Sequence, residues 1–136
     1  MEKILDRKGE KEHEGVHAVI IKDGKILRGL RNYDSGPKWI IPGGRCEDKE
    51  TLLETLTREL EEETGIENFK IIKYLGSVEG IHQGYKTNVF QVETDEEPYL
   101  KEADNFGEWK WMTLEESERL GANPHITELI KKNFRY

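Results

Sequence analysis

The sequence predicts an α/β fold contained in one domain, residues 1–136. Short runs of β-branched and apolar residues, separated by Gly, Pro, Asn and Asp, are typical of strands. A longer segment carries leucines three and four residues apart, which is typical of an amphipathic helix. A chain of 136 residues suits one domain with one hydrophobic core.

The first expected elements are the two strands of a hairpin between Gly15 and Arg31. This segment, GVHAVIIKDGKILRGLR, places the turn dipeptide Asp23-Gly24 between two apolar runs. Residues 32–38, NYDSGPK, are residue types common in turns, and the apolar run Trp39–Ile41 predicts another short strand. We expect that strand to stop at Pro42-Gly43-Gly44, ahead of a helix.

The helix is expected from Glu50 to Thr64. Asp48 can serve as its N-cap, and Gly65 matches the position just past a helix end. Its apolar stripe consists of Leu52, Leu53, Leu56 and Leu60. The stripe predicts that one face of this helix lies on the core, beside an acidic edge.

Three further strands and two helices are expected in the second half of the chain. The strands are Phe69–Val78, Thr87–Val92 and Glu108–Met112, with loops at residues 80–84 and 93–105. The helices run from Thr113 or Leu114 to Leu120 and from about His125 to Asn133, with start signals at Thr113 and Asn123-Pro124. Trp109 and Trp111 alternate along the last strand and so point the same way, which favours packing on the core over a shelf that stacks a purine.

The composition excludes several classes of protein. A net charge of −7 with scattered positive charges leaves no basic stripe for a nucleic acid polymer. The lone Cys46 excludes a disulfide framework and a cysteine-based zinc site. Because the sequence has no run of 18 apolar residues and no signal-peptide pattern, we expect a cytoplasmic protein without a membrane partner. An acidic protein can still bind a small phosphate compound through a divalent cation.

Glu59, Glu62 and Glu63 fall on one face of the expected helix, because they are separated by three and four residues. Like charges at this spacing cost an isolated helix on the order of 0.2–0.5 kcal/mol per pair. Two arrangements would reduce that repulsion: a helix face open to solvent, or a cation held between the carboxylates. The surrounding residues favour the second arrangement.

Residues 44–66 resemble the signature of the Nudix hydrolases. That signature is a glycine, five residues, a glutamate, seven residues and then Arg-Glu-aliphatic-any-Glu-Glu-any-Gly-aliphatic. The chain supplies every constrained position, namely Gly44, Glu50, Arg58, Glu59, Leu60, Glu62, Glu63, Gly65 and Ile66. Trp39 and Pro42 also match the usual lead-in to the signature.

The resemblance implies an α/β/α sandwich with a mixed β-sheet. The Glu50–Thr64 helix would cover one face and the C-terminal helix the other. It also implies hydrolysis of a nucleoside diphosphate linked to another group, dependent on Mg²⁺ or Mn²⁺. The implied metal ligands are the carboxylates of Glu59, Glu62 and Glu63 and the carbonyl of Gly43.

The resemblance also assigns roles in the reaction. Glu50 and Arg58 are implied to form a structural ion pair. The implied catalytic carboxylates are Glu59, Glu62, Glu63 and Glu102. One carboxylate must accept a proton from the attacking water; Glu59 is the first choice, with Glu102 and Glu108 as alternatives.

Other residues resemble family positions that bind substrate. Arg31 matches a basic residue that can contact the phosphates, although a surface arginine at a strand end is an equal interpretation. The pairs Lys101-Glu102 and Glu108-Trp109 and the segment Ala122-Asn123-Pro124 resemble the MutT-like branch, which hydrolyses nucleoside triphosphates. In that branch Asn123 would be a base-reading amide, but an asparagine before proline is also a typical helix N-cap.

The expected substrate is therefore a ribo- or deoxyribonucleoside triphosphate, or an oxidised nucleotide, cleaved to a nucleoside monophosphate and pyrophosphate. The alternatives are hydrolysis of ADP-ribose or of a dinucleoside polyphosphate, and a nucleotide sensor that does not cleave. Tyr85 is a candidate contact for a dinucleoside polyphosphate, and His82 lies in a loop where relatives often contact substrate. The sequence leaves open whether the chain forms a homodimer.

Overall fold

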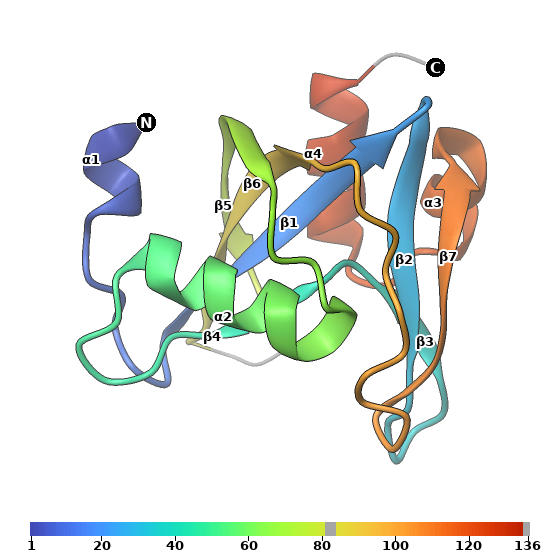
Figure 1. Ribbon diagram of the computed structural model, residues 1–136, viewed down its shortest axis with the longest axis horizontal. Coiled ribbons are helices and arrows are strands. Elements are labelled where there is room, and N and C mark those ends of the chain that lie inside the picture. The colour runs from blue at the N-terminus through green and yellow to red at the C-terminus, as the bar shows by residue number, and fades with distance from the viewer. Residues whose placement is uncertain (81–83, 135–136) are drawn as a thin grey trace.

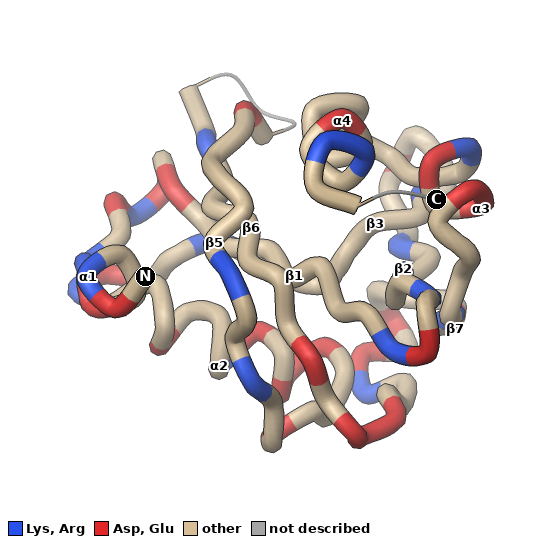
Figure 2. Tube along the Cα trace, turned by 90° about the horizontal axis from the view of Figure 1, so that it is seen from above, with Lys and Arg blue, Asp and Glu red and all other residues tan. Residues whose placement is uncertain are grey.

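The computed structural model describes residues 1–80 and 84–134 (Figure 1). Its elements are α1 (Glu2–Leu5), β1 (Glu14–Lys22), β2 (Lys25–Arg31), β3 (Lys38–Ile40), β4 (Gly43–Arg45), α2 (Leu52–Thr64), β5 (Lys70–Glu79), β6 (Lys86–Glu93), β7 (Phe106–Thr113), α3 (Leu114–Leu120) and α4 (Pro124–Asn133). No described helix is long and apolar enough to cross a membrane. Along the described chain, Lys and Arg are interspersed with Asp and Glu (Figure 2).

The strands form one mixed sheet, as the sequence interpretation expected. Its main order is β3-β2-β1-β6-β5, with β4 paired to β1 and β7 paired to β2. Strand β1 is antiparallel to β2 and β4 and parallel to β6. This central strand therefore joins the two halves of the sheet.

The expected hairpin is present, and its turn has the backbone that Asp-Gly favours. Asp23 and Gly24 have φ values of 51° and 74°, and left-handed values at both central residues match the twist of a two-residue hairpin. Pairing between β1 and β2 is short, at Ile21↔Ile26 and Lys22↔Lys25. Nearer its start, β1 pairs instead with β4 and β6.

We expected Pro42-Gly43-Gly44 to end a strand and to lead into the helix. The preceding strand does end there, but Gly43–Arg45 then form a further strand, β4, against β1. The reason is close approach of the two backbones. A Cβ atom at Gly43 would lie 2.2 Å from the carbonyl oxygen of Val16, and Gly43 has a φ of 155°. Only glycine allows this pairing without strain.

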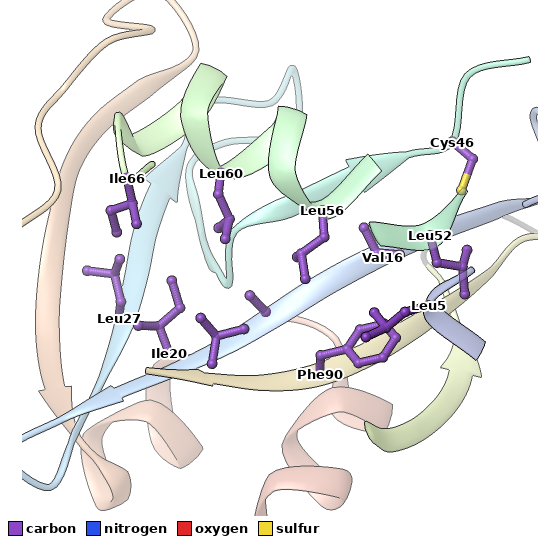
Figure 3. Close-up of a cluster of buried hydrophobic side chains, with 12 residues drawn as sticks. Leu5, Val16, Ile20, Leu27, Cys46, Leu52, Leu56, Leu60, Ile66 and Phe90 are labelled. Atoms are coloured by element: carbon purple, nitrogen blue, oxygen red, sulfur yellow. The ribbon is translucent and has the colours of Figure 1, made fainter. Parts of the chain in front are cut away.

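Two hydrophobic clusters lie on opposite faces of the sheet, which gives the expected α/β/α layers (Figure 1). Leu52, Leu56 and Leu60 of α2 point toward the sheet on one face (Figure 3). Ile126 and Ile130 of α4 pack on the other face. Trp109 and Trp111 are partly buried against the first cluster, as expected.

The expected N-cap of α2 was wrong. Thr51, not Asp48, precedes the helix, and its hydroxyl accepts a hydrogen bond from the Glu54 amide at 3.1 Å. Glu54 accepts one from the Thr51 amide in return, which completes a capping box. Lys49 has a left-handed φ of 64°, so a helix cannot continue back through it to Asp48. The other end is as expected, since Gly65 is left-handed with a φ of 77°.

Candidate active site

The acidic face of α2 lies against the backbone of β4. A Cβ atom at Gly44 would lie 2.4 Å from the carboxyl carbon of Glu59, so this carboxylate rests where a larger residue would place its side chain. The amide of Gly43 donates a hydrogen bond to Oε1 of Glu63 at 2.8 Å. Gly43 and Gly44 of β4 therefore contact two glutamates of the signature, Glu63 and Glu59.

Arg58 links the glutamates to one another. Its Nε and Nη2 donate to both oxygens of Glu50, at 2.7 and 3.0 Å, and its Nη1 donates to Glu59 at 2.6 Å. Nη1 also approaches Glu62 at 3.3 Å, and Nη2 donates to the Arg45 carbonyl at 3.0 Å. The hydrogen bonds from Arg58 lower the pKa of Glu50 to about 2. The structure thus brings Glu50 and Arg58 together as a bidentate ion pair.

Glu59 and Glu63 are desolvated, and this changes how they titrate. Burial raises the pKa of Glu59 to about 7 against the opposing effect of Arg58, and it raises the pKa of Glu63 well above its ordinary value. Repulsion from Glu62 raises the pKa of Glu59 further, and Glu102 raises the pKa of both buried groups. These four carboxylates are therefore close enough to interact.

Glu102 reaches this group through the segment between β6 and β7. Tyr99 in this segment donates its amide to the Thr64 carbonyl at 2.9 Å, and its ring occupies the space beside Gly65. Lys101 forms an ion pair with Glu61 of α2. These contacts hold the segment against the C-terminal end of α2. Glu108 lies exposed on β7, outside the cavity described below.

A divalent cation fits the chemistry of this group. Among residues 1–80 and 84–134, no three His, Cys, Asp or Glu side chains are already arranged around a point where an ion could sit. The carboxylates are instead turned to Arg58, to the Gly43 amide and to Arg31. Hard carboxylate oxygens suit Mg²⁺ and Mn²⁺. A cation would offset the cost of burying the charged carboxylates of Glu59 and Glu63 and would reduce their mutual repulsion, the two effects that raise their pKa values.

A cavity of about 360 Å³ opens beside these carboxylates. Glu59 and the backbone of Gly43 and Gly44 contribute to one part of its lining, and Arg31 and Arg45 also line it. Nη1 of Arg31 lies 3.5 Å from Oε2 of Glu63. The cavity therefore has cationic groups next to the acidic face, as a site for a metal-bound phosphate compound requires.

Asn123 also lines the cavity, but its side chain is already engaged. Its Oδ1 accepts from the amides of His125 and Ile126, at 3.0 and 3.4 Å, and its Nδ2 donates to the Glu79 carbonyl at 3.3 Å. The structure therefore has Asn123 as the N-cap of α4, which was one of the two interpretations. Reading of a base by the same amide stays a prediction.

Tyr85 lies on the cavity wall, with the Arg45 guanidinium 5.3 Å from its ring centre. Burial raises the pKa of Tyr85 to about 12. His82 falls outside the described residues.

Sequence reasoning assigned no role to several side chains of the cavity, among them His17, Arg28 and Arg45. The Nδ1 atom of His17 lies 2.6 Å from the hydroxyl of Thr87, and burial lowers the pKa of His17 to about 4, with a further effect of Arg31. No spacing in the sequence pointed to this histidine. Arg28 did leave a signal, because it is a charged residue within the apolar run ILRGL of a strand.

Comparison with known proteins shows the family of this chain. A family model described as NUDIX domain matches residues 11–132. An RNA pyrophosphohydrolase of Pelagibacter ubique (strain HTCC1062) is 29% identical over 135 residues, which cover 85% of this chain and 80% of the relative. A CTP pyrophosphohydrolase of Escherichia coli (strain K12) is 45% identical over 56 residues, which cover 40% of this chain and 42% of the relative. The crystal structure of a MutT NUDIX hydrolase from Burkholderia pseudomallei superposes with a TM-score of 0.72 at 24% identity, covering 93% of this chain and all of that one.

Proposed function

The chain belongs to the Nudix hydrolase family, and from this membership we propose that it is a Mg²⁺-dependent pyrophosphohydrolase of nucleotides. The proposed substrate is a nucleoside triphosphate or an oxidised form of one. The products are a nucleoside monophosphate and pyrophosphate. We propose residues 1–136 as a single domain of this kind.

One observation carries the proposal. The carboxylates of Glu59 and Glu63 meet the glycine backbone of β4 beside a cavity that Arg31 and Arg45 also line. Carboxylates alone would repel a triphosphate. Arginines and a divalent cation together make the same cavity suitable for one.

Glu59, Glu62, Glu63 and the Gly43 carbonyl are the proposed holders of the cation. When bound, Mg²⁺ would supply positive charge that offsets the charge of the diphosphate oxygens. The role proposed for Arg58 and Glu50 is to hold Glu59 in place through the hydrogen bonds that Arg58 makes to both.

The reaction proposed for the site is a hydrolysis. The oxygen of a water molecule forms a bond to phosphorus while the bond from phosphorus to the bridging oxygen breaks, and the bridging oxygen leaves with its electron pair. A carboxylate accepts the proton of the water, and Glu59 is the first choice with Glu102 as the alternative. Arg31 and Arg45 are proposed to orient the phosphates.

The names of relatives support the class of reaction without deciding the substrate. The two relatives from different organisms are an RNA pyrophosphohydrolase and a CTP pyrophosphohydrolase, so both a free nucleotide and the 5′-triphosphate of an RNA belong in a substrate panel. ADP-ribose and dinucleoside polyphosphates complete the panel, because Tyr85 lines the cavity.

The test is a product analysis of the purified protein with Mg²⁺ against this panel. Normal and oxidised nucleoside triphosphates are expected to yield a monophosphate and pyrophosphate. A Glu62→Gln, Glu63→Gln double variant removes two proposed metal ligands and is expected to lower kcat by 100-fold or more, the order expected for loss of electrostatic stabilisation. Glu115→Gln, at an exposed position of α3, is the matched control.

Different outcomes contradict different parts of the proposal. Turnover of ADP-ribose or a dinucleoside polyphosphate alone would keep the hydrolysis and remove the triphosphate assignment. Turnover of 5′-triphosphate RNA alone would do the same in favour of RNA. Nucleotide binding without turnover of any compound would favour a sensor, and full activity of the double variant would remove the proposed metal site.

A further inference from the structure

Arg28 is a buried cation on the wall of the cavity. It comes from β2, it is 1% exposed, and it is the largest of the fully buried side chains among the described residues. A buried arginine normally has a carboxylate partner, because desolvating an unpaired charge costs several kcal/mol. The partners of Arg28 therefore need an explanation.

Its partners in the structure are neutral, and they leave donors unused. The Nε atom donates to the Ser117 hydroxyl at 2.9 Å, and Nη1 donates to the Trp39 carbonyl at a long 3.4 Å. Nη2 has no partner among the described residues. A guanidinium carries five N–H groups. Both N–H groups of Nη2 are therefore buried without a partner at the wall of the cavity.

Arg28 does not belong to the acidic side of the cavity. Burial lowers its pKa to about 10, and no described carboxylate offsets that effect. Arg31 is different, since it pairs with Glu63. The surroundings of Arg28 are instead the Trp39 carbonyl and the turn after α3 at Gly121.

The turn at Gly121 makes room for the guanidinium. A Cβ atom at Gly121 would lie 2.5 Å from both Cζ and Nη2 of Arg28, so alanine would not fit without displacing it. The next residue, Ala122, donates its amide to the Trp39 carbonyl at 2.8 Å and lines the cavity. Ile40, Ile41 and Ile126 contribute apolar surface to the same cavity. A guanidinium on the wall of a cavity with apolar surface suits a flat, polar-edged group such as a nucleobase.

We propose that Arg28 is a specificity-determining residue that binds the nucleobase of the substrate through two adjacent hydrogen-bond acceptors. Guanine offers such a pair at O6 and N7, and cytosine offers one at O2 and N3. Adenine presents a donor at N6 beside N7, and uracil presents a donor at N3 between its carbonyls. The proposal rests on the proposed function. It assigns base selection to Arg28 rather than to Asn123, whose side-chain amide caps α4.

The experiment measures binding, so that it does not depend on hydrolysis. Dissociation constants of GMP, CMP, AMP and UMP are determined by calorimetry for the wild-type protein, for Arg28→Met and for Arg119→Met. Arg119 is an exposed arginine of α3, and its variant is the matched control. The wild type and the control are expected to prefer GMP or CMP over AMP and UMP on the order of 10- to 100-fold, and Arg28→Met is expected to lose that preference.

Base analogues identify the atoms and the base. The wild type is expected to bind 7-deaza-GMP, which lacks the N7 acceptor, about tenfold more weakly than GMP if guanine is the base, and 3-deaza-CMP more weakly than CMP if cytosine is the base. Arg28→Met is expected to bind each analogue and its parent equally. The comparison on wild-type protein stands even if the variant fails to fold, which circular dichroism detects.

Several results would overturn the proposal. They are equal binding of all four monophosphates by the wild type, an unchanged preference in Arg28→Met, or an equal loss for all four bases in that variant. Base selection without any hydrolysis of the triphosphates would leave this inference standing and remove the proposed function. Hydrolysis without base selection would do the reverse.

Discussion

Gly44 gives the Glu59 carboxylate its position beside β4. The Cβ of an alanine would meet a flexible side-chain end, 2.4 to 2.7 Å away, rather than backbone. Gly44 lacks the left-handed φ that restricts some glycines, so the backbone accepts the change. A substitution at Gly44 should therefore affect the site more than the fold.

We therefore expect Gly44→Ala to lower kcat/KM by tenfold or more through displacement of Glu59, while the midpoint of thermal unfolding changes by only a few degrees. Steady-state kinetics and a thermal melt measure the two effects. Gly107→Ala is the control, because its Cβ would make only ordinary contacts, at 3.7 Å and beyond. A large drop in stability with normal activity per folded molecule would contradict this role of Gly44.

Glu14 is a second residue whose neighbours decide its behaviour. Its side chain is fully buried, where it pairs with Arg7 and accepts a hydrogen bond from Asn88 at 2.8 Å. Lys86 lies 3.9 Å away. Burial alone would raise the pKa of Glu14, but the hydrogen bonds from Arg7, Asn88 and the Glu10 amide outweigh it and lower this pKa to about 2.

This shift predicts a pH-dependent contribution to stability. A carboxylate whose pKa is lower in the folded state stabilises the fold above its unfolded pKa, near 4.5, and loses that effect as pH falls toward 2. We expect Glu14→Gln to lower the free energy of unfolding by about 3 kcal/mol at pH 7, with a difference that shrinks between pH 4.5 and pH 2. Urea unfolding across this range measures it, and a constant difference would contradict the pairing. Glu115→Gln, at an exposed position, is expected to change little.

At the scale of elements, α2 combines local and long-range determinants. Its capping box at Thr51 and Glu54 and its left-handed Gly65 fix where it begins and ends. Leu52, Leu56 and Leu60 pack it on the sheet, and the segment carrying Tyr99 and Lys101 contacts its C-terminal end. The helix therefore holds its glutamates in place from both ends.

We expect Thr51→Ala to lower the free energy of unfolding by about 1 kcal/mol, because the Glu54 amide loses its side-chain acceptor. Thr57→Ala, at an exposed position inside the same helix, is expected to be neutral or slightly stabilising, since alanine has the higher helix propensity. Chemical unfolding of both variants compares the two. Equal effects would mean that the cap does not stabilise α2.

The whole molecule carries a net charge of −7 and concentrates several carboxylates at one site. A cation that binds there selectively in the folded state stabilises it by mass action, about 2.7 kcal/mol at 100 times its dissociation constant. We therefore expect millimolar Mg²⁺ to raise the midpoint of thermal unfolding of the wild type.

The same Mg²⁺ is expected to have little effect on the Glu62→Gln, Glu63→Gln variant beyond that of NaCl at matched ionic strength. The salt control separates binding from general screening of an acidic protein. An equal rise in both proteins would indicate screening alone and would count against the proposed metal site.

Local features of the chain were predictable from the sequence. The Asp23-Gly24 hairpin, the end of α2 at Gly65 and the Asn123-Pro124 start of α4 each depend on neighbours a few residues away. The leucine stripe of α2 was predicted except for Leu53, which is exposed. The N-cap of α2 shows the limit of this reasoning. Asp48 and Thr51 are both suitable caps by type, and the left-handed backbone at Lys49 decided between them.

Apart from α1 and β4, which were not predicted, the sequence by itself determined the order of strands and helices and the acidic signature of α2, because these follow from residue type and spacing along the chain. Only the tertiary structure decided that Gly43–Arg45 pair with β1, that the segment carrying Tyr99 and Lys101 contacts the end of α2, and that Arg28 becomes a cation with no carboxylate partner among the described residues beside a cavity. These arrangements bring together residues far apart in sequence. They depend on backbone approach, burial and charge in three dimensions, which spacing along the chain does not record.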